Sequence, residues 1–202
     1  MRQTLRELRL AASVGAALAT ACLAFAAAAN SLEPMERQPA ADELQPGLSV
    51  VYYFNFFRHV REIDEWKKYR DGTPGPAITQ LNYNVGQGEV LTSGKPEGVG
   101  AEISGLIHLD KPGTYAFAVQ SNDGVRVEIG GLKVIEDPDV HTDRFSEIAQ
   151  VEVAEPGWYP LNIVYFERKN TSTLELYWQP PDVAAGTMPL VPAEALAHLK
   201  TE

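Results

Sequence analysis

Between residues 101 and 179 the chain alternates apolar and polar residues in short runs, and each run stops at a turn of Gly, Asp, Asn or Pro. In one such run Tyr115, Phe117 and Val119 occupy every second position. This period of two is typical of a strand with one buried face. Asp123-Gly124 and Gly130-Gly131 supply the positive backbone angles that tight hairpins need. We therefore expect antiparallel strands joined by short turns.

The same reasoning extends to most of the chain. Apolar runs rich in β-branched and aromatic residues predict strands at residues 48–54, 77–89, 101–109, 150–153, 157–167 and 172–179. Residues 55–69 fit either a short amphipathic helix or an irregular crossover, residues 71–76 a Gly/Pro loop, and residues 193–199 a short terminal helix. Many short strands joined by turns predict an all-β domain over residues 48–199, an antiparallel β-sandwich or flattened barrel with minor short helices.

Residues 1–29 have the composition of a secretory signal peptide. Three arginines precede an uncharged stretch rich in Ala and Leu, which ends in the small residues Ala27 to Ala29. A membrane anchor, a buried helix and a lipid anchor at Cys22, which lies in a sequence loosely like a bacterial lipobox, are the alternatives. Cleavage leaves a mature protein without a membrane-spanning segment, exported to the periplasm, the cell surface or the medium.

Residues 30–47 contain three prolines, several charges and few large apolar residues, so they predict a flexible linker before the domain. The whole chain is acidic, with 27 Asp and Glu against 17 Lys and Arg and a net charge of -10 at pH 7. Such a surface repels nucleic acid, tolerates neutral sugars and attracts divalent cations.

Motifs of catalysis are missing from the sequence. It contains no Gly-x-Ser-x-Gly, P-loop, dinucleotide-binding glycine pattern or His-Glu-x-x-His. The single cysteine, Cys22, falls in the predicted signal peptide and leaves the mature domain without a thiol nucleophile. We therefore expect a protein that is not an enzyme.

Five short motifs follow one another in order between residues 103 and 180: Pro112-Gly113-Thr114-Tyr115-Ala116-Phe117, Ser121-Asn122-Asp123-Gly124-Val125-Arg126-Val127, Gly157-Trp158-Tyr159-Pro160-Leu161, Tyr165-Phe166-Glu167 and Leu176-Tyr177-Trp178. In this order they resemble the PA14 domain, a β-sandwich family named after a fragment of a bacterial toxin component. The resemblance extends over about residues 48–199.

The resemblance implies a site at one turn. In sugar-binding members of the family two adjacent aspartates hold a Ca²⁺ ion that contacts sugar hydroxyls, and the matching positions here are Asn122 and Asp123. The Asn removes one negative charge from the ligand set, so weaker calcium binding is expected. The alternative is that residues 121–124 form only a turn, because Asn and Asp stabilise turns through their own side chains.

Further oxygen ligands would come from an acidic connection between residues 134 and 146. Asp137, Asp139 and Asp143 lie there beside His141, in a spacing that can surround an ion but lacks the glycine and closing glutamate of an EF-hand. Asp137 and Asp139 therefore join Asn122 and Asp123 as candidate calcium ligands. A solvated acidic loop is the alternative.

Trp158 follows a Pro-Gly turn and is a candidate for stacking against a sugar ring, although a place in the core is the alternative for it as for Trp66 and Trp178. The sequence thus predicts an exported, non-catalytic PA14-like module that binds glycans at the cell envelope, with Ca²⁺ as a candidate cofactor. The alternative is a structural domain that docks another envelope protein without sugar or metal.

Overall fold

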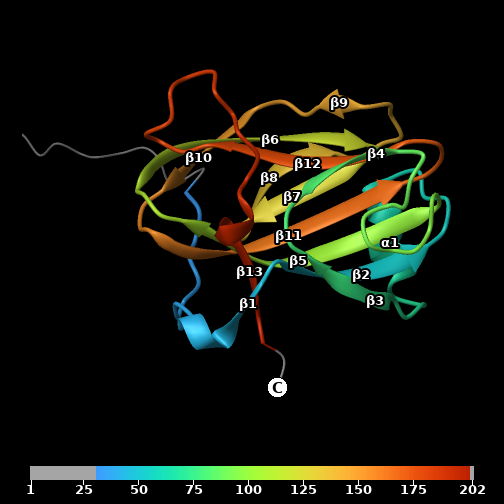
Figure 1. Cartoon of the computed structure of the whole chain (residues 1–202), viewed down its shortest axis with the longest axis horizontal. Helices are drawn as coiled ribbons and strands as arrows, with labels where there is room; N and C mark the ends of the chain where they lie inside the picture. Colours follow the sequence, from blue (N-terminus) through green and yellow to red (C-terminus); the bar gives the residue numbers. More distant parts are fainter. Residues whose placement is uncertain (1–30, 201–202) are drawn as a thin grey trace, which may run out of the picture.

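The computed structural model describes residues 31–200. These residues form two antiparallel sheets packed face to face (Figure 1). The all-β sandwich predicted from the alternating pattern is therefore confirmed, and the two sheets do not close into a barrel. The predicted signal peptide, Cys22 included, lies outside the described residues.

The larger sheet has eight strands. Six follow one another in the order β1 (Leu44–Pro46), β13 (Leu196–Leu199), β5 (Val99–Leu109), β11 (Gly157–Glu167), β7 (Val125–Ile129) and β8 (Leu132–Asp137). Off this path, β2 (Leu48–Phe54) pairs with β5, and β3 (Thr73–Ile78) pairs with β2. β5 and β11 pair along their whole length, from Leu109 opposite Gly157 to Val99 opposite Glu167, and form the centre of the sheet.

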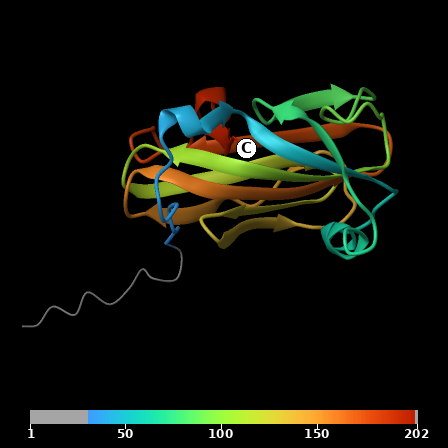
Figure 2. The ribbon, with the colours of Figure 1, turned by 90° about the horizontal axis from the view of Figure 1, so that it is seen from below.

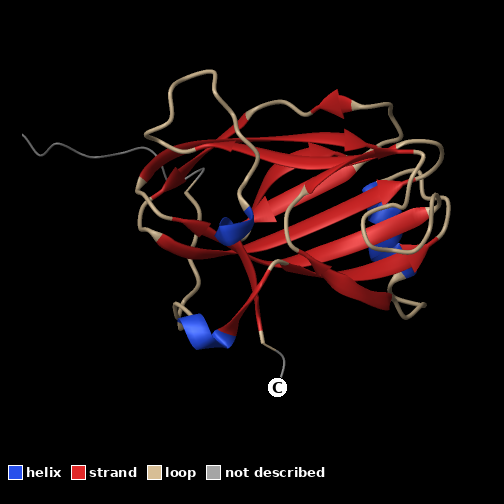
Figure 3. Ribbon diagram, viewed as in Figure 1, coloured by secondary structure: helices blue, strands red, loops and turns tan. Residues whose placement is uncertain are grey.

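The smaller sheet has five strands. They are β10 (Ala149–Val153), β6 (Gly113–Asn122), β12 (Ser172–Gln179), β4 (Asn82–Gly86) and the two-residue β9 (Arg144–Phe145), which pairs with β6. The helices are short (Figure 3): α1 (Val60–Trp66) and the 3-10 turns η1 (Ala41–Glu43) and η2 (Ala193–Ala195). In the perpendicular view of Figure 2, α1 (teal) stands to one side of the strands.

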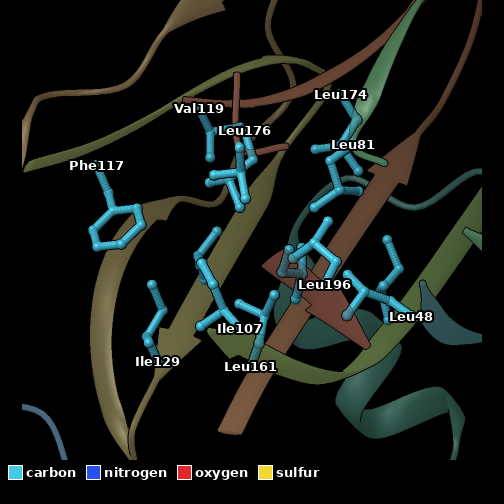
Figure 4. Close-up of a cluster of buried hydrophobic side chains, with 14 of the residues drawn as sticks. Leu48, Leu81, Ile107, Phe117, Val119, Ile129, Leu161, Leu174, Leu176 and Leu196 are labelled. Atoms are coloured by element: carbon cyan, nitrogen blue, oxygen red, sulfur yellow. The ribbon is translucent and has the colours of Figure 1, made fainter. Parts of the chain in front are cut away.

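The core lies between the two sheets. Labelled side chains from both of them point toward one another in Figure 4, among them Phe117 and Leu176 of the smaller sheet and Ile107 and Leu161 of the larger sheet. Alternation along the strands produces this layer, because successive side chains of a strand face opposite ways.

A second, smaller apolar cluster lies on the outer face of β11. Val164 and Phe166 pack there with Val60 and Ile63, the two buried residues of α1. The short helix, one of the two alternatives for residues 55–69, is thus confirmed at residues 60–66 and covers the larger sheet from outside.

Residues 31–47 differ from the flexible linker expected. Leu32 is 2% exposed and belongs to the core, and β1 pairs in register with β13, with Leu44 opposite Leu199. Backbone hydrogen bonds hold this polar segment: Leu32, Glu33 and Met35 donate to Glu152, Gly130 and Trp158, and β1 pairs with β13. The segment therefore needs no apolar run of its own.

Three local expectations were wrong. The single strand expected at residues 77–89 is divided, because β3 ends at Ile78 in the larger sheet and β4 (Asn82–Gly86) belongs to the smaller sheet. Residues 73–76, expected in a loop, belong to β3, whose position at the sheet edge tolerates Pro74 and Pro76. Residues 193–199, expected as a helix, form η2 and then β13, because Leu196 pairs with Ile107 and is buried in the core.

Candidate functional site

The turn singled out in the sequence lies at the end of the sandwich where β6 and β11 finish (Figure 1). Two other connections reach the same place: the β8–β9 connection and the β11–β12 loop. Together they enclose a pocket of about 400 Å³, lined by residues 122–123, 140–142 and 168–171. The site is therefore made of loops that a rigid pair of sheets holds together.

Backbone contacts fix the turn to β11. The N–H of Asp123 donates to the carbonyl oxygen of Phe166 at 3.0 Å, and the N–H of Phe166 donates to the carbonyl oxygen of Gly124 at 3.0 Å. A Cβ on Gly124 would lie 2.6 Å from the Phe166 ring and 2.7 Å from the Pro138 carbonyl oxygen. Only glycine fits at this position. The Asn122–Asp123 peptide bond is cis.

The carboxylate of Asp123 joins the three connections. Its Oδ1 accepts a hydrogen bond from the backbone N–H of His141 at 3.1 Å, and its Oδ2 accepts one from the backbone N–H of Arg168 at 2.8 Å. The residue is 3% exposed. Burial raises the pKa of the Asp123 carboxyl, and the two N–H donors offset part of that rise. Asp123 thus organises the loops around the pocket.

Asn122 is held from two sides. Its carbonyl oxygen accepts a hydrogen bond from the Tyr165 hydroxyl at 2.6 Å, and its Nδ2 donates to Oγ1 of Thr171 at 2.8 Å. Tyr165 is fully buried, whereas Thr171 lines the pocket. The amide of Asn122 is therefore already oriented by the protein.

A second buried acid lies near the turn. Glu167 is 0% exposed, and its Oε1 has no hydrogen-bond partner among the described residues. Burial is the main cause that raises the pKa of Glu167 to about 7, and the charge of Asp123 raises it further. The N–H of Gly98, 3.2 Å from Oε2, acts in the opposite direction. In the sequence Glu167 belonged to a strand motif, and nothing marked it as part of the site.

The candidate ligands Asp137 and Asp139 do not line the pocket. Arg144 donates to both carboxylate oxygens of Asp137 and lowers the pKa of that carboxyl, while Asp139 is exposed and bridges the backbone of His59. Within residues 31–200 no three His, Cys, Asp or Glu side chains gather in a way that would hold a metal. The structure thus brings Asn122 and Asp123 into the pocket and leaves the two other candidates outside it.

The lining residues fit calcium poorly. Calcium takes six to eight oxygens and favours carboxylates. Asp123 is the sole carboxylate among the residues lining this pocket, and both its oxygens already accept N–H donors. Arg168 and Lys169 bring two positive charges to the same pocket. The calcium site expected from the sequence stays a prediction, and the charges of the pocket oppose it.

Trp158 lies elsewhere. It is the second residue of β11, which Glu167 ends, and at about 3.3 Å per residue Trp158 and Glu167 are about 30 Å apart. Its indole is half-buried against the His108 ring, with the ring centroids 4.8 Å apart. Trp178 is buried at 8% exposure, and Trp66 packs edge-on against Phe57. None of the three tryptophans lines the pocket at Asn122 and Asp123.

Sequence comparison identifies the fold family. The family model described as PA14 domain matches residues 44–191, which is most of the chain. The chain belongs to the PA14 domain family. The resemblance read from the five ordered motifs is therefore confirmed. No curated protein is significantly similar to this PA14 domain.

Solved structures share the fold at low sequence identity. The PA14 domain of the MpAFP antifreeze protein superposes with a TM-score of 0.66 at 15% identity, over 81% of this chain and 96% of its own. A PA14 sugar-binding domain from an RTX adhesin gives 0.57 at 18% identity, over 76% and 98%. The epithelial adhesin 9 A domain of Candida glabrata, solved in complex with Galb1-3GlcNAc, gives 0.60 at 13% identity, over 84% and 97%.

The helices of the described residues are short. In residues 31–200 none of them has the length and apolar character needed to cross a membrane.

Proposed function

We propose that this PA14 domain is an exported, non-catalytic module that binds carbohydrate in the pocket at Asn122 and Asp123. The observation that carries the proposal is the convergence of three connections on one concave site with fixed polar groups. Its volume of about 400 Å³ falls in the range of about 300–1,000 Å³ found for small-molecule sites.

The neighbours add a second line of support. Two structures with the same fold are a PA14 sugar-binding domain and an adhesin domain in complex with a disaccharide. Fold alone does not transfer a ligand, so the pocket of this chain has to supply the recognition. The N-terminal sequence, which has the composition of a signal peptide, supports the proposed export.

A protein-docking role is the second candidate, because apolar side chains are exposed on another surface. Phe145 is 56% exposed and Ile148 is 62% exposed, and both line a groove of about 490 Å³ beside β8. Exposed apolar groups that gather in this way mark interaction sites more often than single exposed residues do.

A glycan array probed with residues 30–202 tests the carbohydrate proposal. Thr142→Trp places an indole in the pocket, since Thr142 is an exposed lining residue. Thr187→Trp makes the same change on an exposed loop that does not line this pocket. We expect glycan binding that Thr142→Trp abolishes and Thr187→Trp retains. Silence of the folded protein across the array would overturn the carbohydrate proposal and favour the docking role.

A further inference from the structure

Two neighbouring cations in the pocket lack acidic partners. Half of the Lys and Arg side chains in residues 31–200 form ion pairs, as Arg144 does with Asp137 and Arg126 with Asp64. In the described part of the chain, the Arg168 guanidinium and the Lys169 ammonium take part in no ion pair and no hydrogen bond. Arg58, Arg61, Arg70 and Lys95 are also unpaired there, but they lie outside this pocket.

The two cations differ in exposure, because Arg168 is half-buried whereas Lys169 is exposed. Arg168 is half-buried, and its Nε is a buried donor without a partner. A buried donor that makes no hydrogen bond costs free energy. The Lys169 ammonium lies 5.3 Å from the centroid of the Phe56 ring. Both residues line the pocket and neither charge is paired, although the Lys169 ammonium lies near Phe56, which lines a separate groove.

The one carboxylate that lines the pocket does not neutralise the positive charges of Arg168 and Lys169. Asp123 is its one lining carboxylate, and each oxygen accepts a backbone N–H. His141 has a buried Nε2 without a hydrogen bond, 3.4 Å from the Asp137 carboxylate. Lining side chains thus sum to a positive charge in a chain whose net charge is -10. The positive lining would attract an anionic ligand.

We propose that the ligand of this pocket is an acidic sugar whose carboxylate binds Arg168 and Lys169. The inference rests on the carbohydrate-binding function proposed above and names the substrate class of the same site. A guanidinium matches a carboxylate with two parallel N–H donors, and an ammonium adds a point charge. Thr171, beside Asn122 and on the pocket wall, offers a polar partner for the ring hydroxyls. The protein's own cations here supply the positive charge that a metal would otherwise bring.

Ligands that differ only in the charge of the carboxylate measure its contribution to binding. Trimers of galacturonate, glucuronate and mannuronate are compared with their methyl esters, which keep each ring and remove the charge. Titration calorimetry on residues 30–202 measures Kd for each pair at low and at high NaCl. We expect at least one uronate trimer to bind about tenfold or more tighter than its ester, as one charge-assisted hydrogen bond permits. High salt should reduce the difference in Kd between uronate and ester, because it screens partly exposed charges.

Variants of the two cations localise the effect. Arg168→Gln and Lys169→Ala should each weaken uronate binding about tenfold and leave binding of the ester unchanged. Lys169→Arg should retain the preference, because it keeps the positive charge. Lys95→Ala is the control, since Lys95 is an exposed basic residue outside this pocket. Circular dichroism confirms that each variant is folded.

The outcomes separate this inference from the function on which it rests. Neutral glycans that bind, are blocked by Thr142→Trp and are preferred to uronates would overturn the acidic-sugar inference and leave carbohydrate binding intact. Uronate binding that is unchanged in Arg168→Gln and Lys169→Ala would also overturn it, as would recognition of sulfated but not carboxylated glycans. Absence of any glycan binding would remove both proposals together.

Discussion

The hydroxyl of Tyr165 donates a 2.6 Å hydrogen bond to the carbonyl oxygen of Asn122, the residue that opens the site turn. Tyr165 comes from β11 and is 0% exposed, so a core side chain of the larger sheet holds a loop of the pocket. The site therefore inherits its geometry from the packing of the sandwich.

Removal of this hydroxyl should cost stability. Tyr165→Phe leaves the buried carbonyl oxygen of Asn122 without its donor, and an unsatisfied buried acceptor costs about 1–3 kcal/mol. We expect that loss in the free energy of unfolding, measured by urea denaturation. Tyr69→Phe is the control, because Tyr69 is 81% exposed. Equal stability of the two variants would show that the hydroxyl does not fix the turn.

Glu167 gives stability a pH dependence. Its folded-state pKa of about 7 lies above its ordinary value of 4.5, so the folded protein retains the proton more strongly than the unfolded chain. The stabilising contribution is fully present below about pH 4.5 and is lost as the pH rises through about 7. Between about pH 5 and about pH 8 the free energy of unfolding of the native protein should fall by about 2 kcal/mol. Glu167→Gln should not show this fall.

Urea denaturation of native protein and variant at both pH values measures this difference. Titrations that the two proteins share cancel in the comparison. Glu147→Gln is the control, because Glu147 is exposed. Parallel pH profiles for native protein and Glu167→Gln would mean that Glu167 titrates normally.

The sheets were predictable because alternation of residue type is a local property of the sequence. The hairpin between β7 and β8 illustrates this: Gly130 and Gly131 have φ angles of 55° and 77°, as a tight turn requires. Leu32 carried no comparable signal. Its burial depends on a strand arrangement far along the chain, and a single leucine among polar residues has no period.

The site was only partly predictable for the same reason. Asn122 and Asp123 were found through a motif. Asp137 was placed with them because of the spacing of acids in its connection, and Trp158 because it follows a Pro-Gly turn. The loop with Arg168 and Lys169 is polar and has no pattern, so its place beside the turn follows only from β11 ending where β6 ends. Proximity of this kind is set by topology, which one sequence does not encode locally.

The N-terminal segment should contribute measurably to stability. Leu32 is 2% exposed, and truncation of a buried leucine costs about 2–5 kcal/mol through lost contacts and the cavity left behind. Leu32→Ala should therefore destabilise the domain by that amount in urea denaturation. Leu199→Ala, at a position that is 42% exposed, should cost far less. Similar values for both variants would mean that residues 31–47 do not pack on the core in solution.

Calcium should not change the thermal stability of the native protein. Asp123 is the one carboxylate of the pocket and Arg168 and Lys169 oppose a divalent cation, so millimolar Ca²⁺ or EGTA should not move the thermal midpoint. Asn122→Asp is the matched test, because it adds a buried carboxylate beside Asp123. Without metal this variant should melt lower, since two close buried carboxylates repel each other. Calcium should then restore part of the loss by binding between them. A rise in the native midpoint that EGTA reverses, and that Asp123→Asn lacks, would instead establish a calcium site in the native protein and make metal, not the two cations, the partner of the sugar.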